Sequence, residues 1–182
     1  RWWLALSPEH QSNDTPAWLP VEVIEQLIAF KTSKSVSSLR NEAARRLDMF
    51  WGKILTMLQS EPDVAVIVSR LMLILKRIIR RSTYLLLLND HPKAMKKLLT
   101  VVAKSPWLTE LIAEHPLLMD ELLLPSPTEE AFSKTEMQES LKQTLRWGSE
   151  QLEDQMEHLR HFKLVYLFRI AVAELDESID LD

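Results

Sequence analysis

The side chains best suited to chemistry in this sequence are two histidines near its C-terminal end. His158 and His161 are three residues apart, and Asp154 and Glu157 stand close by. On a helix, this spacing would allow imidazole and carboxylate groups to share a metal ion. The same spacing is also typical of an exposed polar face with local ion pairs. We favour the polar face, because no third and fourth ligands follow at a matching spacing.

A second candidate is the acid pair Asp180 and Asp182, which resembles the paired carboxylates that hold Mg²⁺ in nucleotidyl transferases. A triphosphate also needs a loop in which several glycines stand close together. The sequence has only two glycines, Gly52 and Gly148, and no local nucleophile motif links its Ser and His residues. We therefore interpret the last acids as a solvated tail. We predict no catalytic, cofactor-binding or metal-binding residue in this chain.

Basic residues interrupt the most apolar part of the sequence, residues 64–88. On one helix Lys76, Arg77, Arg80 and Arg81 would share a face, and Arg70 lies seven residues before Arg77. Such a face could bind an acidic partner or a phosphate. More often it is solvated or meets acids of the same fold. We predict that Arg80 and Arg81 face acidic groups inside the fold, and we keep Arg77, Arg80 and Arg81 as candidates for partner or structural contacts.

Composition sets wider limits. The 182 residues suffice for one domain with a core, and 46% hydrophobic with 26% charged residues is ordinary for a globular protein. A net charge of -4 argues against nucleic acid as the main partner, and the basic residues in the apolar run argue against a membrane span.

The absence of cysteine excludes disulfides and fits a reducing compartment, so we expect a cytoplasmic protein. The start RWWLALSPEH has no initiator Met, which suggests a fragment of a larger protein.

Apolar residues recur with helical spacing along the chain, as at Ile67, Leu71, Ile74 and Ile78, and no stretch alternates as a strand would. Prolines and polar clusters separate these segments. We predict an all-α, bundle-like domain without a sheet. Residues 1–19 would be an irregular N-terminal segment, 20–176 a single helical domain and 177–182 a connector. About eight helices are predicted, over residues 20–30, 38–59, 62–89, 92–103, 106–114, 116–123, 134–147 and 149–176.

The prolines also predict how helices begin. Ser105, and a His such as His115, stand just before a proline at a first helical position, where a cap is expected. Residues 133–136, Ser-Lys-Thr-Glu, match a capping box. We predict that Trp107 packs into the core, as aromatic residues usually do. The leucines of the segment that follows Pro116 should also be mostly buried: Leu117, Leu118 and Leu122.

Two stretches carry recognisable motifs. In residues 80–125 two basic residues precede Ser-x-Tyr-Leu-Leu-Leu-Leu, and an x-Pro turn, a Ser-Pro joint and a Pro-Leu-Leu-x-Asp-Glu-Leu-Leu run follow. In residues 152–175 an acidic, Gln-containing helix runs into Leu-Arg-x-Phe-Lys and then Phe-Arg-Ile-Ala, where Phe168 replaces a usual Leu. Both stretches, in this order, resemble the bacterial glutamine synthetase adenylyltransferase family, also called glutamate–ammonia-ligase adenylyltransferase. The matching residues are Arg80, Arg81, Tyr84, Pro92, Ser105, Pro106, Pro116, Leu117, Leu118, Asp120, Glu121, Leu122, Leu123, Leu159, Arg160, Phe162, Lys163, Arg169, Ile170 and Ala171.

The resemblance implies a function for the full-length parent, in which two nucleotidyltransferase halves share one polypeptide. One half would transfer AMP from ATP to a tyrosine of glutamine synthetase, and the other would remove it by phosphorolysis, in control of nitrogen assimilation. ATP and Mg²⁺ are the implied cofactors, and glutamine synthetase and a PII-type signalling protein the implied partners.

The resemblance places this chain in a helical region just before the second, adenylylating fold. The Gly-Ser/Asp-x-Asp metal motif would lie downstream, and Asp180 and Asp182 do not align with it. We therefore expect the fragment alone to be inactive. The alternative is an independent helical protein–protein interaction module with no nucleotide chemistry.

Overall fold

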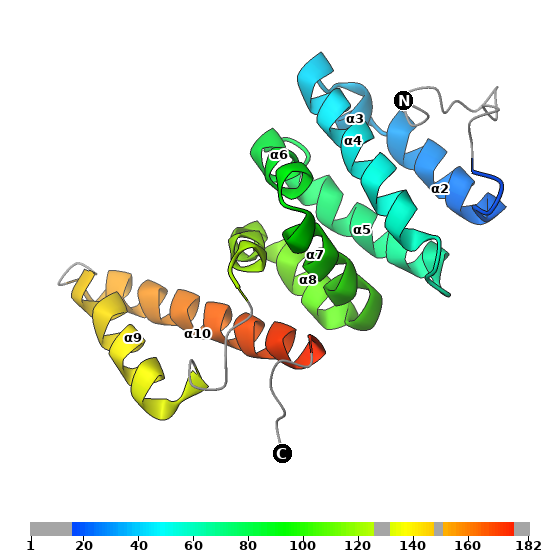
Figure 1. The fold of residues 1–182 in the computed structure, drawn as a ribbon. Coiled ribbons are helices and arrows are strands. Elements are labelled where there is room, and N and C mark those ends of the chain that lie inside the picture. The colour runs from blue at the N-terminus through cyan, green and yellow to red at the C-terminus, as the bar shows by residue number, and fades with distance from the viewer. Residues whose placement is uncertain (1–15, 126–131, 148–150, 177–182) are drawn as a thin grey trace. The chain divides into compact units, whose positions relative to one another are not determined.

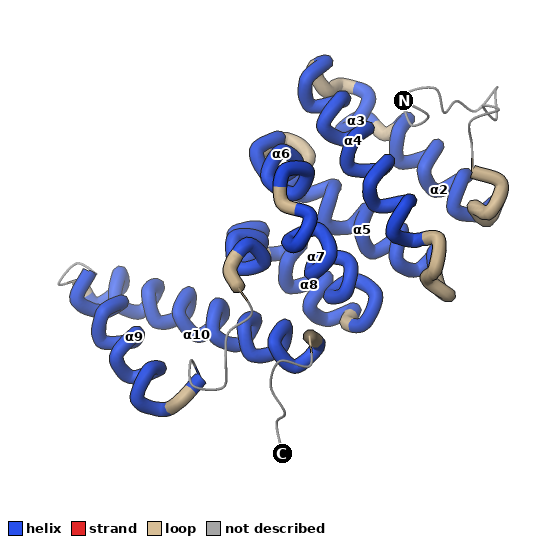
Figure 2. The backbone as a smooth tube through the Cα atoms, in the orientation of Figure 1, coloured by secondary structure: helices blue, strands red, loops and turns tan. Residues whose placement is uncertain are grey.

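The computed structural model describes residues 16–125, 132–147 and 151–176. Within these ranges the chain forms nine α-helices and one 3₁₀ helix, and it contains no strand (Figures 1 and 2). The predicted all-α class is confirmed. Contacts within the chain divide it into two compact units, residues 1–119 and 120–182. The single helical domain over 20–176 remains a prediction, and the irregular segment and the connector lie largely outside the described residues.

Within residues 16–125 the helices follow one another with short connections. The 3₁₀ helix η1 contains the boundary between the two units. The helices have these bounds: α2 Val21–Thr32, α3 Lys34–Ser37, α4 Asn41–Leu58, α5 Val64–Ile78, α6 Ser82–Asp90, α7 Pro92–Lys104, α8 Pro106–Glu114, η1 Pro116–Leu123, α9 Lys134–Trp147 and α10 Leu152–Leu175.

Helix α5 is the centre of the first unit. It packs most extensively against α8 and also against α2, α6 and α7, and Figure 1 shows it running between these helices. The four residues Ile67, Leu71, Ile74 and Ile78, spaced as a helix face requires, are all buried. The periodicity of the sequence therefore predicted both the helix and the face that it buries.

The long helix predicted over 62–89 is wrong, because the chain breaks into α5 and α6. Residues 79–81 form a turn in which the Arg81 N–H donates to the Ile78 carbonyl at 2.7 Å. Arg81 has φ -105° and ψ 73°, outside the helical region. The change of direction lets α6 pack against α4 and bury Leu85 and Leu88. This tertiary packing outweighs the local preference for a continuous helix.

Two of the predicted helix starts are confirmed. The Ser105 hydroxyl accepts a hydrogen bond from the Leu108 N–H at 3.2 Å, and so caps α8. The Ser133 hydroxyl accepts one from the Glu136 N–H at 3.3 Å, which is the first half of the predicted capping box. Short side chains that carry oxygen close to the backbone therefore position both helix starts.

The prediction that a histidine before a proline caps the next helix is wrong. His91 precedes Pro92 at the start of α7, but its side chain accepts no capping hydrogen bond. At His115 the next helix is a 3₁₀ helix, which begins with a backbone bond from the Leu118 N–H to the His115 carbonyl at 3.0 Å. The physical reason is reach, since the imidazole nitrogens lie farther from the backbone than a serine hydroxyl does.

Trp107 contradicts the prediction that it packs into the core, because its side chain is 48% exposed. It shares a helix face with Glu110 and Glu114, three and seven residues later, and both of these are exposed. The next residue, Leu108, begins the buried face of α8. A difference of one position on a helix thus separates an exposed tryptophan from a buried leucine.

The leucines of η1 show the same separation. Leu118 and Leu122 are buried, as predicted, but Leu117 is 57% exposed, so its predicted burial is wrong. Met119 is buried in place of Leu117. A 3₁₀ helix has three residues per turn, so Met119 and Leu122 align on one side while Leu117 points elsewhere.

The second unit pairs α9 with α10 (Figure 1). The C-terminal half of α10 buries Tyr166, Phe168, Val172 and Ala173. The N-terminal half leaves Leu152, Met156 and Leu159 exposed, although they have the same helical spacing. No helix in the described part of the chain is long and apolar enough to cross a membrane.

Candidate functional site

The basic residues do not form the predicted stripe. Lys76 and Arg77 lie in the last turn of α5, where positive charge is favourable next to the helix dipole. Arg80 and Arg81 lie in the turn that follows, and both are exposed. The predicted common face is therefore wrong, because the helix ends at Ile78. Among the described residues neither Arg80 nor Arg81 forms an ion pair, which counts against the prediction that they face acidic groups inside the fold.

Arg70 has a clear structural role instead. Its guanidinium donates to the Val102 carbonyl at 2.8 Å and to the Ala103 carbonyl at 3.0 Å. These carbonyls belong to the last turn of α7, where they have no partner within the helix. Arg70 therefore caps α7 from α5 and adds a positive charge at the negative end of the α7 dipole.

The two histidines line a polar pocket of about 500 Å³ in the second unit, next to Glu121. Asp154 and Glu157 do not line this pocket, and Glu157 forms an exposed ion pair with Arg160 at 3.4 Å. Over the described ranges, no three His, Cys, Asp or Glu side chains gather closely enough to hold a metal. Asp180 and Asp182 lie outside the described residues. The two histidines therefore line one pocket together with the Glu121 carboxyl group, and the described residues around them form no metal centre.

Helices α9 and α10 supply most of the pocket. Ser140 and Thr144 line it from α9, and Phe162, Tyr166 and Arg169 line it from α10. The rings of Phe162 and Tyr166 lie against each other at a centroid distance of 4.4 Å, with their planes tilted by 32°. The pocket is therefore part aromatic and part hydrogen-bonding, on two helices that already pack together.

The most distinctive contact in the pocket joins Glu121 to Arg169. The Arg169 Nε lies 3.1 Å from Glu121 Oε2, and both side chains are partly buried. The same oxygen makes no hydrogen bond among the described residues, so the contact is an ion pair without a directed N–H···O bond. It ties the residues just after the unit boundary to the C-terminal half of α10.

Burial raises the pKa of the Glu121 carboxyl above its usual value of 4.5. The Arg169 charge opposes this shift, and the neighbouring Asp120 charge adds to it. His161 also lowers this pKa, to the smallest extent of the four influences. The ion pair therefore offsets only part of the cost of burying the carboxylate.

The sequence did not indicate this pair. Glu121 belongs to the first stretch with recognisable motifs and Arg169 to the second, and 47 positions of chain separate them. Their types and positions were identified through the resemblance, but no local pattern connects a carboxylate in a 3₁₀ helix with a distant arginine. Only the packing of the second unit brings them together.

The fold and the pocket define an all-helical region whose described residues assemble no metal centre. Residues 95–182 match the family model described as glutamate-ammonia ligase adenylyltransferase. This match covers just under half of the chain and agrees with the resemblance of the two motif stretches.

Curated relatives agree with the family model. Each of the following is named bifunctional glutamine synthetase adenylyltransferase/adenylyl-removing enzyme. The protein from Pseudomonas putida is 36% identical over 89% of this chain and 17% of its own length. The protein from Pseudomonas syringae pv. tomato is 32% identical over 98% of this chain and 19% of its own length. The protein from Hahella chejuensis is 33% identical over 88% of this chain and 17% of its own length. The chain thus spans less than a fifth of these relatives.

Proposed function

We propose that this chain is a non-catalytic helical region of a bifunctional glutamine synthetase adenylyltransferase/adenylyl-removing enzyme. The names of the relatives support the parent activity, and the small share of their length that the chain matches supports a regional role. The same matches disfavour the alternative of an independent interaction module. The role of the region is to position the adenylylating catalytic fold.

In this proposal the full-length protein transfers AMP from ATP to a tyrosine of glutamine synthetase and removes it by phosphorolysis. It does so with Mg²⁺ in the cytoplasm, under the control of a PII-type signalling protein. Metal ions stabilise the charge that develops on the transferred phosphoryl group, and this chemistry belongs to the catalytic folds. The residues of this chain supply a rigid support for them.

The observation that carries the supporting role is the Glu121–Arg169 ion pair. It connects η1 with α10, and α10 is the helix that the resemblance places just before the adenylylating fold. A partly buried pair of opposite charges fixes orientation more than it adds stability. We therefore assign it to positioning.

A charge exchange in the full-length protein tests this proposal. AMP transfer is followed from radiolabelled ATP to glutamine synthetase. Arg169→Glu places two carboxylates together and should lower transfer, whereas Glu121→Arg combined with Arg169→Glu should restore it in part. The exposed ion pair of Glu157 and Arg160 gives a matched control, whose exchange should leave transfer unchanged. Absence of any transfer by the unchanged full-length protein would overturn the proposed function, and full transfer by Arg169→Glu would overturn the positioning role.

A further inference from the structure

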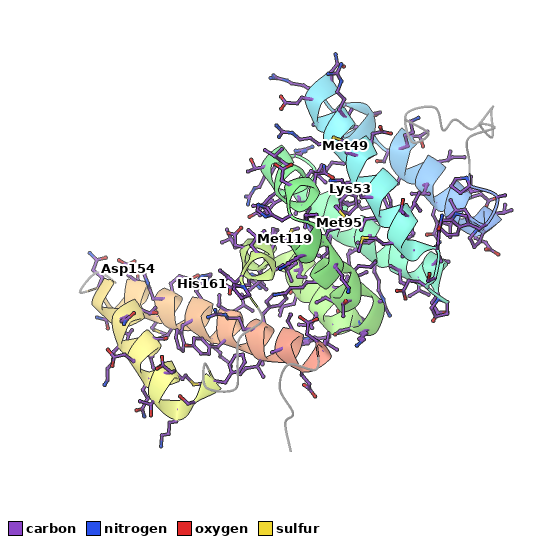
Figure 3. The ribbon with its side chains drawn as sticks, in the orientation of Figure 1. Met49, Lys53, Met95, Met119, Asp154 and His161 are labelled. Carbon is purple, nitrogen blue, oxygen red and sulfur yellow. The ribbon has the colours of Figure 1, made fainter. Side chains whose placement is uncertain are left out.

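The first unit carries an open groove of about 690 Å³ between α4 and α7. Figure 3 labels three of its lining residues, Met49 and Lys53 on α4 and Met95 on α7. Helix α6 packs against both α4 and α7, and so fixes the two walls of the groove relative to each other. The groove is therefore built into the packing of the first unit, and its volume is in the range of binding pockets.

The walls of this groove are apolar and adaptable. Met49, Met57 and Met95 line the groove, of which Met49 is 51% exposed, Met57 is half-buried and Met95 is buried. Methionine surfaces adjust to varied apolar partners. Met49 and Met57 lie eight positions apart on α4, so the groove follows roughly 12 Å of helix, which equals two turns of a partner helix.

Gly52 lies on α4 between these methionines and also lines the groove. Glycine inside a helix is unfavourable compared with alanine. A Cβ atom added here would meet no other atom within 4 Å, so the packing of this chain does not require a glycine. The missing side chain leaves room for another backbone to approach closely.

The charges along the groove are mainly positive. Lys53 and Lys96 line it and are exposed, and neither forms an ion pair with a described residue. Lys53 donates a hydrogen bond only to the backbone carbonyl of Asn89. Asp48 also lines the groove, but its charge acts on Lys31, where it opposes the lowering of the lysine pKa by burial. The positive charges of Lys53 and Lys96 therefore have no acidic counterpart among the described residues and could pair with carboxylates of another protein.

We propose that this groove binds the apolar face of an amphipathic helix whose flanking residues are acidic, supplied by a partner protein. The walls are themselves α-helices, whose backbone groups already bond to one another, so they offer no edge to an extended strand. A helix brings its own backbone hydrogen bonds and needs only an apolar face. Carboxylates beside that face oppose Lys53 and Lys96. This inference goes beyond the proposed function and does not depend on AMP transfer.

The probe for this proposal is a fluorescein-labelled helical peptide with leucines at i, i+4 and i+7 and glutamates on both flanks. Binding to the 182-residue chain is followed by fluorescence anisotropy. Gly52→Leu fills the groove and should weaken binding roughly tenfold or more, whereas Gly52→Ala should have a smaller effect. Both variants remove an unfavourable helix residue and should raise the Tm by about 2–4 °C. Loss of binding in a more stable protein excludes unfolding as its cause.

Charge variants test the acidic flanks. Lys53→Glu combined with Lys96→Glu should weaken binding about three- to tenfold. The same variant should bind a peptide with lysines in place of the glutamates better than the unchanged chain does. Lys34→Glu, an exposed change on α3 outside the groove, is the matched control and should leave binding unchanged.

Three results would overturn the proposal. The first is equal binding of the glutamate peptide to the unchanged chain and to Gly52→Leu. The second is equal binding of the glutamate and lysine peptides to the unchanged chain. The third is concentration-dependent self-association of the chain that Gly52→Leu abolishes, because the groove would then belong to a second copy, whose α10 exposes Leu152 and Met156 beside Glu153.

Discussion

Helix α4 and the N-terminal half of α10 have apolar residues at similar helical spacing, but these residues are buried in α4 and exposed in α10. In α4 the residues Leu47, Phe50, Ile54 and Leu58 are all buried. In α10, Leu152 is 70% exposed, and Met156 and Leu159 are also exposed. Periodicity therefore predicts a helix and the direction of its apolar face, but it does not predict whether another element of the same chain covers that face.

The largest expected effect tests the covered side of this comparison. Trp51 is fully buried, with Phe30 and Phe50 edge-on at centroid distances of 6.3 and 5.7 Å. Trp51→Ala should reduce the free energy of unfolding by about 3–5 kcal/mol, because it removes a large buried side chain and leaves a cavity. Leu152→Ala is the matched change on the uncovered side and should stay within about 0.5 kcal/mol. Urea unfolding measures both, and similar costs would show that the two faces are equally covered.

The next prediction makes the comparison between adjacent residues of η1. Leu118→Ala should cost about 2–5 kcal/mol because Leu118 is buried. Leu117→Ala should cost less than about 0.5 kcal/mol because that side chain is exposed. Chemical denaturation of the two variants checks this difference. A larger cost for Leu117→Ala would contradict the 3₁₀ geometry described for this segment.

A smaller effect is expected at the helix starts. Ser105→Ala removes the acceptor of the Leu108 N–H and should cost about 0.5–2 kcal/mol. His91 also stands just before a proline, but its side chain makes no capping hydrogen bond. His91→Ala should therefore leave the free energy of unfolding almost unchanged. Thermal unfolding measures both. Equal losses for the two variants would mean that the proline, and not the serine, sets the helix start.

The smallest expected effect depends on pH. Burial raises the pKa of Glu121 above 4.5, so the folded chain holds this proton more tightly than the unfolded chain does. The contribution of Glu121 to stability is therefore greatest below about pH 4.5 and declines as pH rises through its raised pKa. Glu121→Gln cannot titrate and should lack this decline.

The measurement is the free energy of unfolding of both proteins between pH 4 and 7. The stability of Glu121→Gln relative to the unchanged chain should increase with pH across this range. The difference should remain within about 1 kcal/mol, because the Arg169 pair is only partly buried. A relative stability of Glu121→Gln that falls with rising pH would show that the ion pair with Arg169 outweighs burial.

Short-range sequence patterns predicted the features that depend on neighbouring residues. The helix periods, the Ser105 and Ser133 caps and the proline joints depend on residues only a few positions apart, and the structure confirms them. The break at residues 79–81 could not be predicted, because it depends on how α6 packs against α4. The exposure of Trp107 and Leu117 depends on where a helix meets its neighbours, and apolar residue type alone does not fix it.

The candidate sites were harder to predict than the fold. Arg80 and Arg81 remain candidates for partner or structural contacts, but the helix face predicted for them does not exist, because α5 ends at Ile78. The Glu121–Arg169 pair joins two distant segments, and no spacing rule connects them. Gly52 was the one available indication of the groove, since a glycine in the middle of a strongly periodic helix has a cost that calls for an explanation.

The central proposal is that this chain supports the AMP transfer of the full-length protein without performing it. The most direct test incubates the purified 182-residue chain with glutamine synthetase, Mg²⁺ and radiolabelled ATP, beside the full-length protein. We predict AMP transfer by the full-length protein and no labelling by the chain alone, because nothing in its sequence forms a phosphate-binding loop. Robust transfer by the chain, abolished by Asp180→Asn and Asp182→Asn together, would contradict this claim.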